Sequence, residues 1–197
     1  MRCIILSLLA LGLLFTVPHT GAAAEGERIS LPAPDKTGGV PLMQALAGRK
    51  STRSFNKNEP VPMEQVSNLV WAAFGVNRPD GRRTAPTARN TQEVAVFAVM
   101  QNGVWRYEAE KHELVRVMAS DERSRFGGWP LTLLFAAPVG AYGSMHVGSL
   151  YQNTGLYCAS AGLNNVVKAT GASALDGVLP LPKGYKVLIV QSVGLPE

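Results

Sequence analysis

The chain has little cysteine and little charge of either sign. It carries two cysteines in 197 residues, too few for a disulfide framework or a four-thiolate metal site. Charged residues make up 17% of the chain against 46% hydrophobic residues, a balance that excludes intrinsic disorder. Glycine and proline are plentiful but follow no period, so the chain is not collagen-like. Internal repeats, heptads and low-complexity tracts are also missing.

Most motifs of side-chain catalysis are missing as well. The sequence has no Gly-x-Gly-x-x-Gly, Walker loop, Gly-x-Ser-x-Gly, His-Glu-x-x-His or Cys-x-x-Cys, and no carboxylate pair indicates a glycosidase. His112 lies in a polar hairpin and is expected to be solvated, and a lone histidine such as His146 is more often structural. We therefore predict no catalytic side chain and no metal site. An enzyme of this composition would depend on a bound cofactor.

The N-terminal 24 residues have the pattern of a secretory signal peptide. Arg2 precedes an apolar run from Cys3 to Val17, and the small residues 22–24 follow it. The run is short for a membrane span, which needs roughly 20 residues, although an uncleaved anchor is the alternative. We expect an exported protein, periplasmic or secreted, with no membrane contact beyond this segment. The remaining cysteine, Cys158, lies in an apolar run and is expected to be buried and unreactive.

After the signal segment we expect an extended leader over residues 25–40 and one domain over residues 41–197. The apolar spacing predicts helices over 41–47, 62–74 and 147–161, with Leu42, Ala45 and Leu46 sharing the buried face of the first. Strands are predicted over 93–100, 104–107, 114–117, 131–136 and 186–193. Helices and strands mix without regular alternation, which predicts an α+β fold.

Two polar clusters are candidates for binding a ligand. Residues 49–55 (Arg-Lys-Ser-Thr-Arg-Ser-Phe) hold three cations and three hydroxyl groups, which suit a phosphate; a basic surface stretch is the alternative. Residues 83–92 belong to a long loop, and the amides of Asn90 and Gln92 can pair with the edge of a heteroaromatic ring; a polar loop tip is the alternative. A third pair, Gln152-Asn153, interrupts the last helix, where core hydrogen bonding is an equal alternative.

These clusters, in this order, resemble the motifs of the nitroreductase family of FMN-dependent oxidoreductases. Within this family, the chain is most similar to the short branch that resembles the thiazole/oxazole-type dehydrogenases of peptide maturation. The resemblance covers residues 41–196. The matching segments are 49–55, 69–77, Pro86 to Gln92, Gln152-Asn153 with Gly162-Leu163, and Val193 to Pro196.

The resemblance implies a nitroreductase-like fold, with a central, mostly antiparallel sheet flanked by helices. It also implies a homodimer with FMN at the interface. Arg49, Lys50 and Ser51 would hold the phosphate and ribityl chain, and Arg53 would lie near the pyrimidine edge, where a cation stabilises negative charge. The whole implied cofactor-binding set is Arg49, Lys50, Ser51, Arg53, Pro86, Thr87, Asn90, Gln92, Val167, Lys168, Ala169 and Thr170.

The implied function is an exported FMN-dependent oxidoreductase that transfers a hydride or electrons between a donor such as NAD(P)H and a small organic acceptor. One alternative is an FMN-dependent dehydrogenase of a heterocyclic or peptide-derived substrate. Another is a flavin- or ligand-binding member of the fold without turnover. A polyanion or membrane-surface binder is a third, based on the positive charge and four loop arginines. Because that loop has no stacking aromatics, we expect no nucleic-acid partner.

Overall fold

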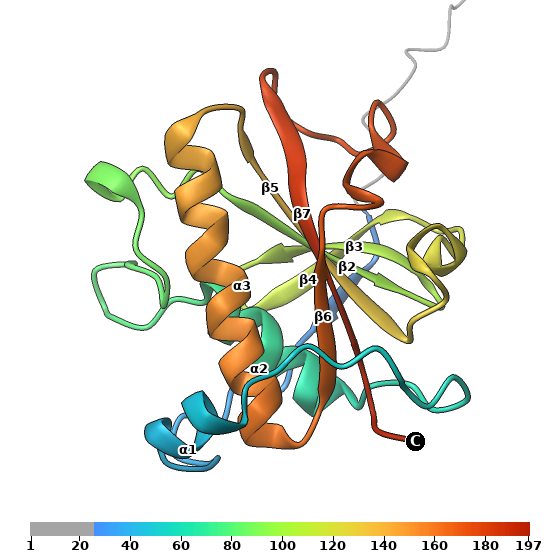
Figure 1. Cartoon of the computed structure of the whole chain (residues 1–197). Coiled ribbons are helices and arrows are strands. Elements are labelled where there is room, and N and C mark those ends of the chain that lie inside the picture. Colours follow the sequence, from blue (N-terminus) through green and yellow to red (C-terminus); the bar gives the residue numbers. More distant parts are fainter. Residues whose placement is uncertain (1–25) are drawn as a thin grey trace, which may run out of the picture.

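A computed structural model describes residues 26–197 as one antiparallel sheet covered by helices (Figure 1). The signal-peptide prediction lies outside the described residues. The seven strands follow the order β1-β4-β3-β2-β5-β7-β6, and every pairing is antiparallel. The strands are β1 Arg28–Ser30, β2 Ala95–Met100, β3 Gly103–Glu108, β4 Glu113–Met118, β5 Leu131–Pro138, β6 Asn164–Lys168 and β7 Tyr185–Gly194. The α+β prediction and the antiparallel sheet are confirmed.

Three α-helices accompany the sheet: α1 Leu42–Gly48, α2 Met63–Phe74 and α3 Ala141–Ala161. Helix α2 buries Val66, Leu69, Val70 and Ala73, which is the predicted apolar stripe. Helix α3 ends at Gly162, whose φ of 70° is the left-handed conformation that favours glycine. Short 3-10 helices cover Ala88–Asn90, Arg123–Phe126 and Ala172–Leu175.

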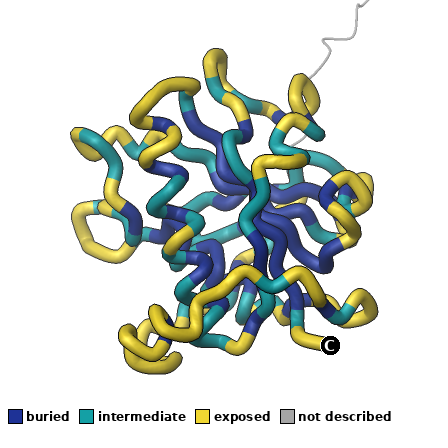
Figure 2. The backbone as a smooth tube through the Cα atoms, viewed as in Figure 1, coloured by how far each residue is buried: buried dark blue, intermediate teal, exposed yellow. Residues whose placement is uncertain are grey.

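The core has two layers, one on each face of the sheet. Leu133 and Phe135 of β5 point toward α2 and α3, whereas the neighbouring Leu134 and Ala136 point toward the 3-10 helices on the other face. This alternation is the period of two that a strand imposes on its side chains. Figure 2 shows the buried backbone at the centre and the exposed loops around it. Within residues 26–197, no helix is long and apolar enough to cross a membrane.

Several local predictions need correction. The leader contributes the edge strand β1, which pairs with β4. Helix α3 begins six residues before its predicted start. Its first turn contains Gly143, where a Cβ would meet the carbonyl oxygen of Pro138, so the close approach to β5 requires a residue that weakens the helical signal. In α1 only Ala45 is buried, because the helix packs by one edge.

His112 is not a solvated residue. Its Nε2 donates to the carbonyl oxygen of Pro32 at 3.0 Å and lies 2.7 Å from Ser67 Oγ, and its Nδ1 accepts from Tyr107 Oη at 2.9 Å. Burial lowers the pKa of the imidazole. Cys158 is buried as predicted, and its burial raises the pKa of the thiol.

Candidate functional site

The segment 49–55 runs extended after α1 and is anchored through its backbone. The amide of Thr52 donates to the carbonyl oxygen of Asn165 at 2.8 Å. The side-chain amide of Asn164 donates to the carbonyl oxygen of Ser54 at 3.0 Å. Both partners belong to β6, so the segment is fixed along the edge of the sheet.

Phe55 anchors the end of this segment. Its ring stacks on Trp129 with centroids 3.9 Å apart, and the pair forms a small buried cluster with Val166 of β6. Gly194 lies so close that a Cβ there would stand 2.9 Å from Phe55 Cβ. The hydrophobic end of the segment therefore holds the polar part in place.

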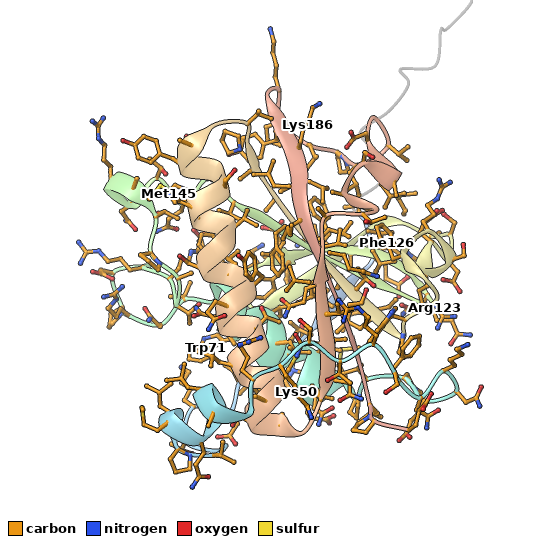
Figure 3. All side chains as sticks on the ribbon, in the orientation of Figure 1. Lys50, Trp71, Arg123, Phe126, Met145 and Lys186 are labelled. Carbon is orange, nitrogen blue, oxygen red and sulfur yellow. The ribbon has the colours of Figure 1, made fainter. Side chains whose placement is uncertain are left out.

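The predicted phosphate-binding side chains are exposed. Arg49, Lys50, Ser51 and Arg53 lie on the surface, and across the described part of the chain their side chains make no hydrogen bond or ion pair. Figure 3 labels Lys50 at the lower end of α3. Three cations and a hydroxyl without an acidic partner can bind an anion through charge-assisted hydrogen bonds.

A buried amide that the sequence analysis missed lies behind Arg49. Gln191 of β7 is fully buried and donates from Nε2 to Asn165 Oδ1 at 3.0 Å, but its Oε1 has no partner. A Cβ on Gly155 of α3 would lie 3.7 Å from both the Arg49 stem and Gln191 Nε2. An orphaned acceptor beside free cations fits a ligand with both an anionic group and hydroxyl donors. The lone amide within an apolar strand was the available sequence signal.

The loop that carries the second cluster is fixed at its base. Val76 and Arg83 form an antiparallel bridge. The side-chain amide of Asn153 on α3 donates to the carbonyl oxygen of Ala72 at 3.1 Å and to that of Thr84 at 3.5 Å. For Asn153 the core hydrogen-bonding alternative is therefore the observed one, whereas Gln152 is exposed.

The tip of this loop has an unusual backbone. Arg89, Asn90 and Gln92 have φ values of 53°, 54° and 52°, and for a residue other than glycine this conformation costs about 1–2 kcal/mol. Strained backbone of this kind gathers at functional sites. Gln92 supports the conformation, because its Nε2 donates to the carbonyl oxygen of Gly81 at 3.2 Å and to Asn90 Oδ1 at 3.3 Å. Gln92 thus positions Asn90, whose side chain is exposed.

Two further contacts hold the loop. The backbone amide of Gln92 donates to Thr87 Oγ1 at 3.1 Å. Thr87 follows the exposed Pro86. The amide of Ala88 donates to Nε2 of the buried His146 at 2.8 Å. His146 thus anchors the loop through Nε2 as the acceptor, while its buried Nδ1 has no partner.

The last four residues of the implied cofactor-binding set, 167–170, lie in different environments. Val167 lies opposite Gln191 in the β6–β7 register, so it shares the face of the orphaned amide. Lys168 points to the opposite face, where Nζ donates to the carbonyl oxygen of Phe126 at 2.8 Å and burial lowers its pKa. Ala169 and Thr170 are exposed beyond the strand. Val167 and Lys168 therefore belong to strand β6, which the sequence analysis did not predict.

One chain does not bring the two clusters together. Arg49 lies beside Gly155 and the 83–92 loop is fixed to His146, nine residues earlier on α3, or about 14 Å along the helix axis. In Figure 1 the loop (green) projects outward past α3, away from the segment 49–55. The candidate site thus consists of two separate halves on one molecule.

The chain was compared with known proteins. A family model described as "Nitroreductase family" matches residues 46–195. A candidate nitroreductase from Ralstonia eutropha JMP134 superposes with a TM-score of 0.80 and 34% identity, covering 98% of this chain and 99% of that one. A candidate nitroreductase of Methanocaldococcus jannaschii is 26% identical over 154 residues, which are 64% of this chain and 77% of that protein.

Two more distant structures share the fold. The microcin synthetase McbBCD complex of E. coli, with truncated pro-MccB17 bound, has a TM-score of 0.64 and 19% identity, over 97% of this chain and 78% of that one. A nitroreductase of Bacteroides fragilis NCTC 9343, solved with bound FMN, has a TM-score of 0.56 and 13% identity, over 79% of this chain and 88% of that one.

Proposed function

This chain belongs to the nitroreductase family, and from that premise we propose that it is an exported enzyme that passes a hydride or electrons from a donor such as NAD(P)H to a small organic acceptor. Family membership makes it an FMN-dependent oxidoreductase. Bound FMN supplies the redox chemistry, and the residues of the chain bind and orient it. This division of labour agrees with a sequence that has no nucleophile or acid–base motif.

The observation that carries the proposal is the set of unpartnered groups around Arg49. Arg49, Lys50 and Ser51 hold the phosphate, and Arg53 provides positive charge at the ring edge. The Oε1 of Gln191, which has no partner, would accept a hydrogen bond from a hydroxyl group of the cofactor. A buried acceptor without a donor costs about 1–3 kcal/mol, so occupancy of the site would recover that free energy.

We further propose that two copies complete the site. The exposed apolar residues gather on α1, where Met43 is 74% exposed, and on the first turns of α3, where Met145 is 65% exposed. Groups of large exposed apolar side chains such as these are typical of an interface. In a homodimer, the loop with Asn90 from one subunit would meet the 49–53 segment of the other. Light scattering on the purified protein should give twice the mass of the chain; a monomer with a complete FMN site would contradict this.

The test of the function is an FMN titration. The purified protein should show bound-flavin absorption bands, and an Arg49→Ala/Ser51→Ala double variant should bind FMN at least about 100-fold more weakly, since it loses two hydrogen bonds to a charged group. Lys186→Ala is the matched control, because Lys186 is an exposed cation at the far end of β7 (Figure 3). Absence of binding in excess FMN would overturn the proposal.

Reduction by NAD(P)H under anaerobic conditions then tests turnover. Bleaching of the flavin by the donor, followed by recovery on adding a nitroaromatic or quinone acceptor, is the expected result. A protein that binds FMN but is reduced by no donor would instead be the flavin-binding member without turnover. Cell fractionation with N-terminal sequencing tests export, and an uncleaved cytoplasmic product would contradict it.

The second candidate is a dehydrogenase of a heterocyclic or peptide-derived substrate. The likeness to the McbBCD complex favours it, since the shared fold extends over 97% of this chain. Reduction of the bound FMN by a heterocycle-containing peptide, without NAD(P)H, would support this candidate over the first.

A further inference from the structure

A second polar pocket lies behind the 83–92 loop, and no part of the proposed FMN site uses its charges. Its volume is about 340 Å³, at the lower end of the range for small-ligand sites. It is enclosed by the end of α2, the start of β2 and the end of β3. The lining residues that matter here are Arg83, Phe74, Val94, Arg106, Glu108 and Glu110.

Arg83 is the buried cation of this pocket, and its guanidinium is only partly paired. Its side chain is 10% exposed. Nε donates to Gln92 Oε1 at 2.8 Å, and the group lies over the ring of Phe74 at 5.6 Å. Nη1, however, is buried with no partner. An unpaired charged donor in a buried position is rare in folded proteins and indicates a missing acceptor.

Among residues 26–197, the acid that reaches Arg83 is Glu110, and it is a weak partner. Glu110 Oε1 stands 3.6 Å from Nη2, and the Glu110 side chain is 83% exposed. A pair in which one member is so exposed contributes little. Glu110 can therefore leave Nη2. The freed Nη2 and the buried, unpartnered Nη1 then offer a carboxylate the planar fork that donates two hydrogen bonds.

The surrounding charges select for a single negative charge. Arg106 forms an ion pair with Glu108, with Nε and Oε1 2.6 Å apart although not in hydrogen-bond geometry, so the charge of Glu108 offsets that of Arg106. Glu108 and Glu110 would repel a dianion such as phosphate. Phe74 and Val94 give part of the wall an apolar surface, against which a small hydrocarbon body can pack, while Gln92 and the charged residues make the rest of the lining polar. We propose that this pocket binds a small monocarboxylate with an apolar body, held by Nη1 and Nη2 of Arg83.

Calorimetry with benzoate tests the proposal, with benzamide as the neutral ligand of the same shape. The protein should bind benzoate and not benzamide, with and without FMN. Arg83→Gln should weaken benzoate binding by at least about tenfold, as expected for a lost charge-assisted hydrogen bond. Arg82→Gln is the matched control, because Arg82 is an exposed arginine on the same loop, paired with Asp80, and its variant should bind as the unaltered protein does.

Glu110→Gln is a second test that does not depend on whether Arg83→Gln disturbs the structure of the loop. This exposed substitution removes the competing carboxylate, so benzoate should bind a few-fold more tightly. Equal binding of benzoate and benzamide, undiminished binding by Arg83→Gln, or no tightening in Glu110→Gln would each overturn the assignment. Tighter binding of inorganic phosphate than of benzoate would also overturn it. Because benzoate binding is also measured without FMN, a failure of the FMN proposal can be distinguished from a failure of the carboxylate-pocket proposal.

Discussion

The two halves of the candidate site are built in opposite ways. In the segment 49–55 the backbone is anchored to β6, and the side chains of Arg49 and its neighbours are free. In the 83–92 loop the side chains bind one another, and the backbone at Arg89 and Asn90 is strained. One half is an anchored backbone that carries exposed, unpartnered cations. The other is a network that holds amides in a conformation they would not otherwise adopt.

Because of this difference, substitutions in the two halves should affect ligand binding and folding stability differently. Removing one of these cations from the first half should change ligand affinity far more than stability, because no hydrogen bond or ion pair within residues 26–197 is lost. Removing a member of the network in the second half should change both. Substitutions that target the anchor of the first half, or the strain of the second, test this comparison directly.

The largest effect is expected from the anchor of the first half. Phe55→Ala removes the stacked partner of Trp129 and should lower the free energy of unfolding by about 3 kcal/mol, measured by urea denaturation. FMN affinity should fall with it, because the cationic segment is released. Phe55→Leu is the control and should cost less than about 1.5 kcal/mol. Unchanged FMN affinity in the folded Phe55→Ala protein would show that the segment has another anchor.

A smaller effect is expected from the support of the loop. His146→Phe removes the acceptor of the Ala88 amide and leaves a donor unpaired, at a cost of about 1–2 kcal/mol. Hydrogen exchange should show faster exchange at Ala88, with the amide of Thr52 unaffected. Equal acceleration at both amides would mean that the two halves unfold together and are not independent.

Substitution by glycine should change the stability of the protein differently in the two halves. Arg89→Gly relieves a left-handed conformation and should be neutral or stabilise by up to about 1 kcal/mol. Arg49→Gly, at φ −63°, should destabilise by about 0.5–1 kcal/mol, because glycine increases the entropy of the unfolded chain. Thermal denaturation of the two variants measures the difference. Destabilisation by both would argue against strain in the loop.

The dependence of thermal stability on pH should come from His112, which lies in neither half of the candidate site. His112 has a pKa lowered from 6.5 by burial, so the folded state favours the neutral imidazole. Its contribution to stability is complete above pH 6.5 and is lost as the pH falls through the lowered folded-state value. Thermal stability should therefore decline in mild acid, and His112→Gln should reduce that decline. An unaltered decline in the variant would assign it to other groups.

Much of the architecture followed from local pattern. Helix α2 buries one apolar stripe, and the central strand 131–136 is a continuous apolar run buried on both faces, so the residue pattern identified both. Strands β1 and β6 were missed. β1 has three residues and β6 opens with two asparagines, and both exist because a neighbouring strand supplies their hydrogen bonds.

In the candidate site, too, some features follow from local sequence and others from tertiary packing. The sequence alone determined the family and the cationic and amide motifs, because residue type and order are local properties that survive any packing. Only the tertiary structure decided that Gln191 lies unpartnered behind Arg49, that Gln92 supports Asn90, and that Arg83 is buried in a second pocket. Those facts depend on which groups meet across the sheet and α3, and hydrogen bonding and burial are set by neighbours that the chain order does not reveal.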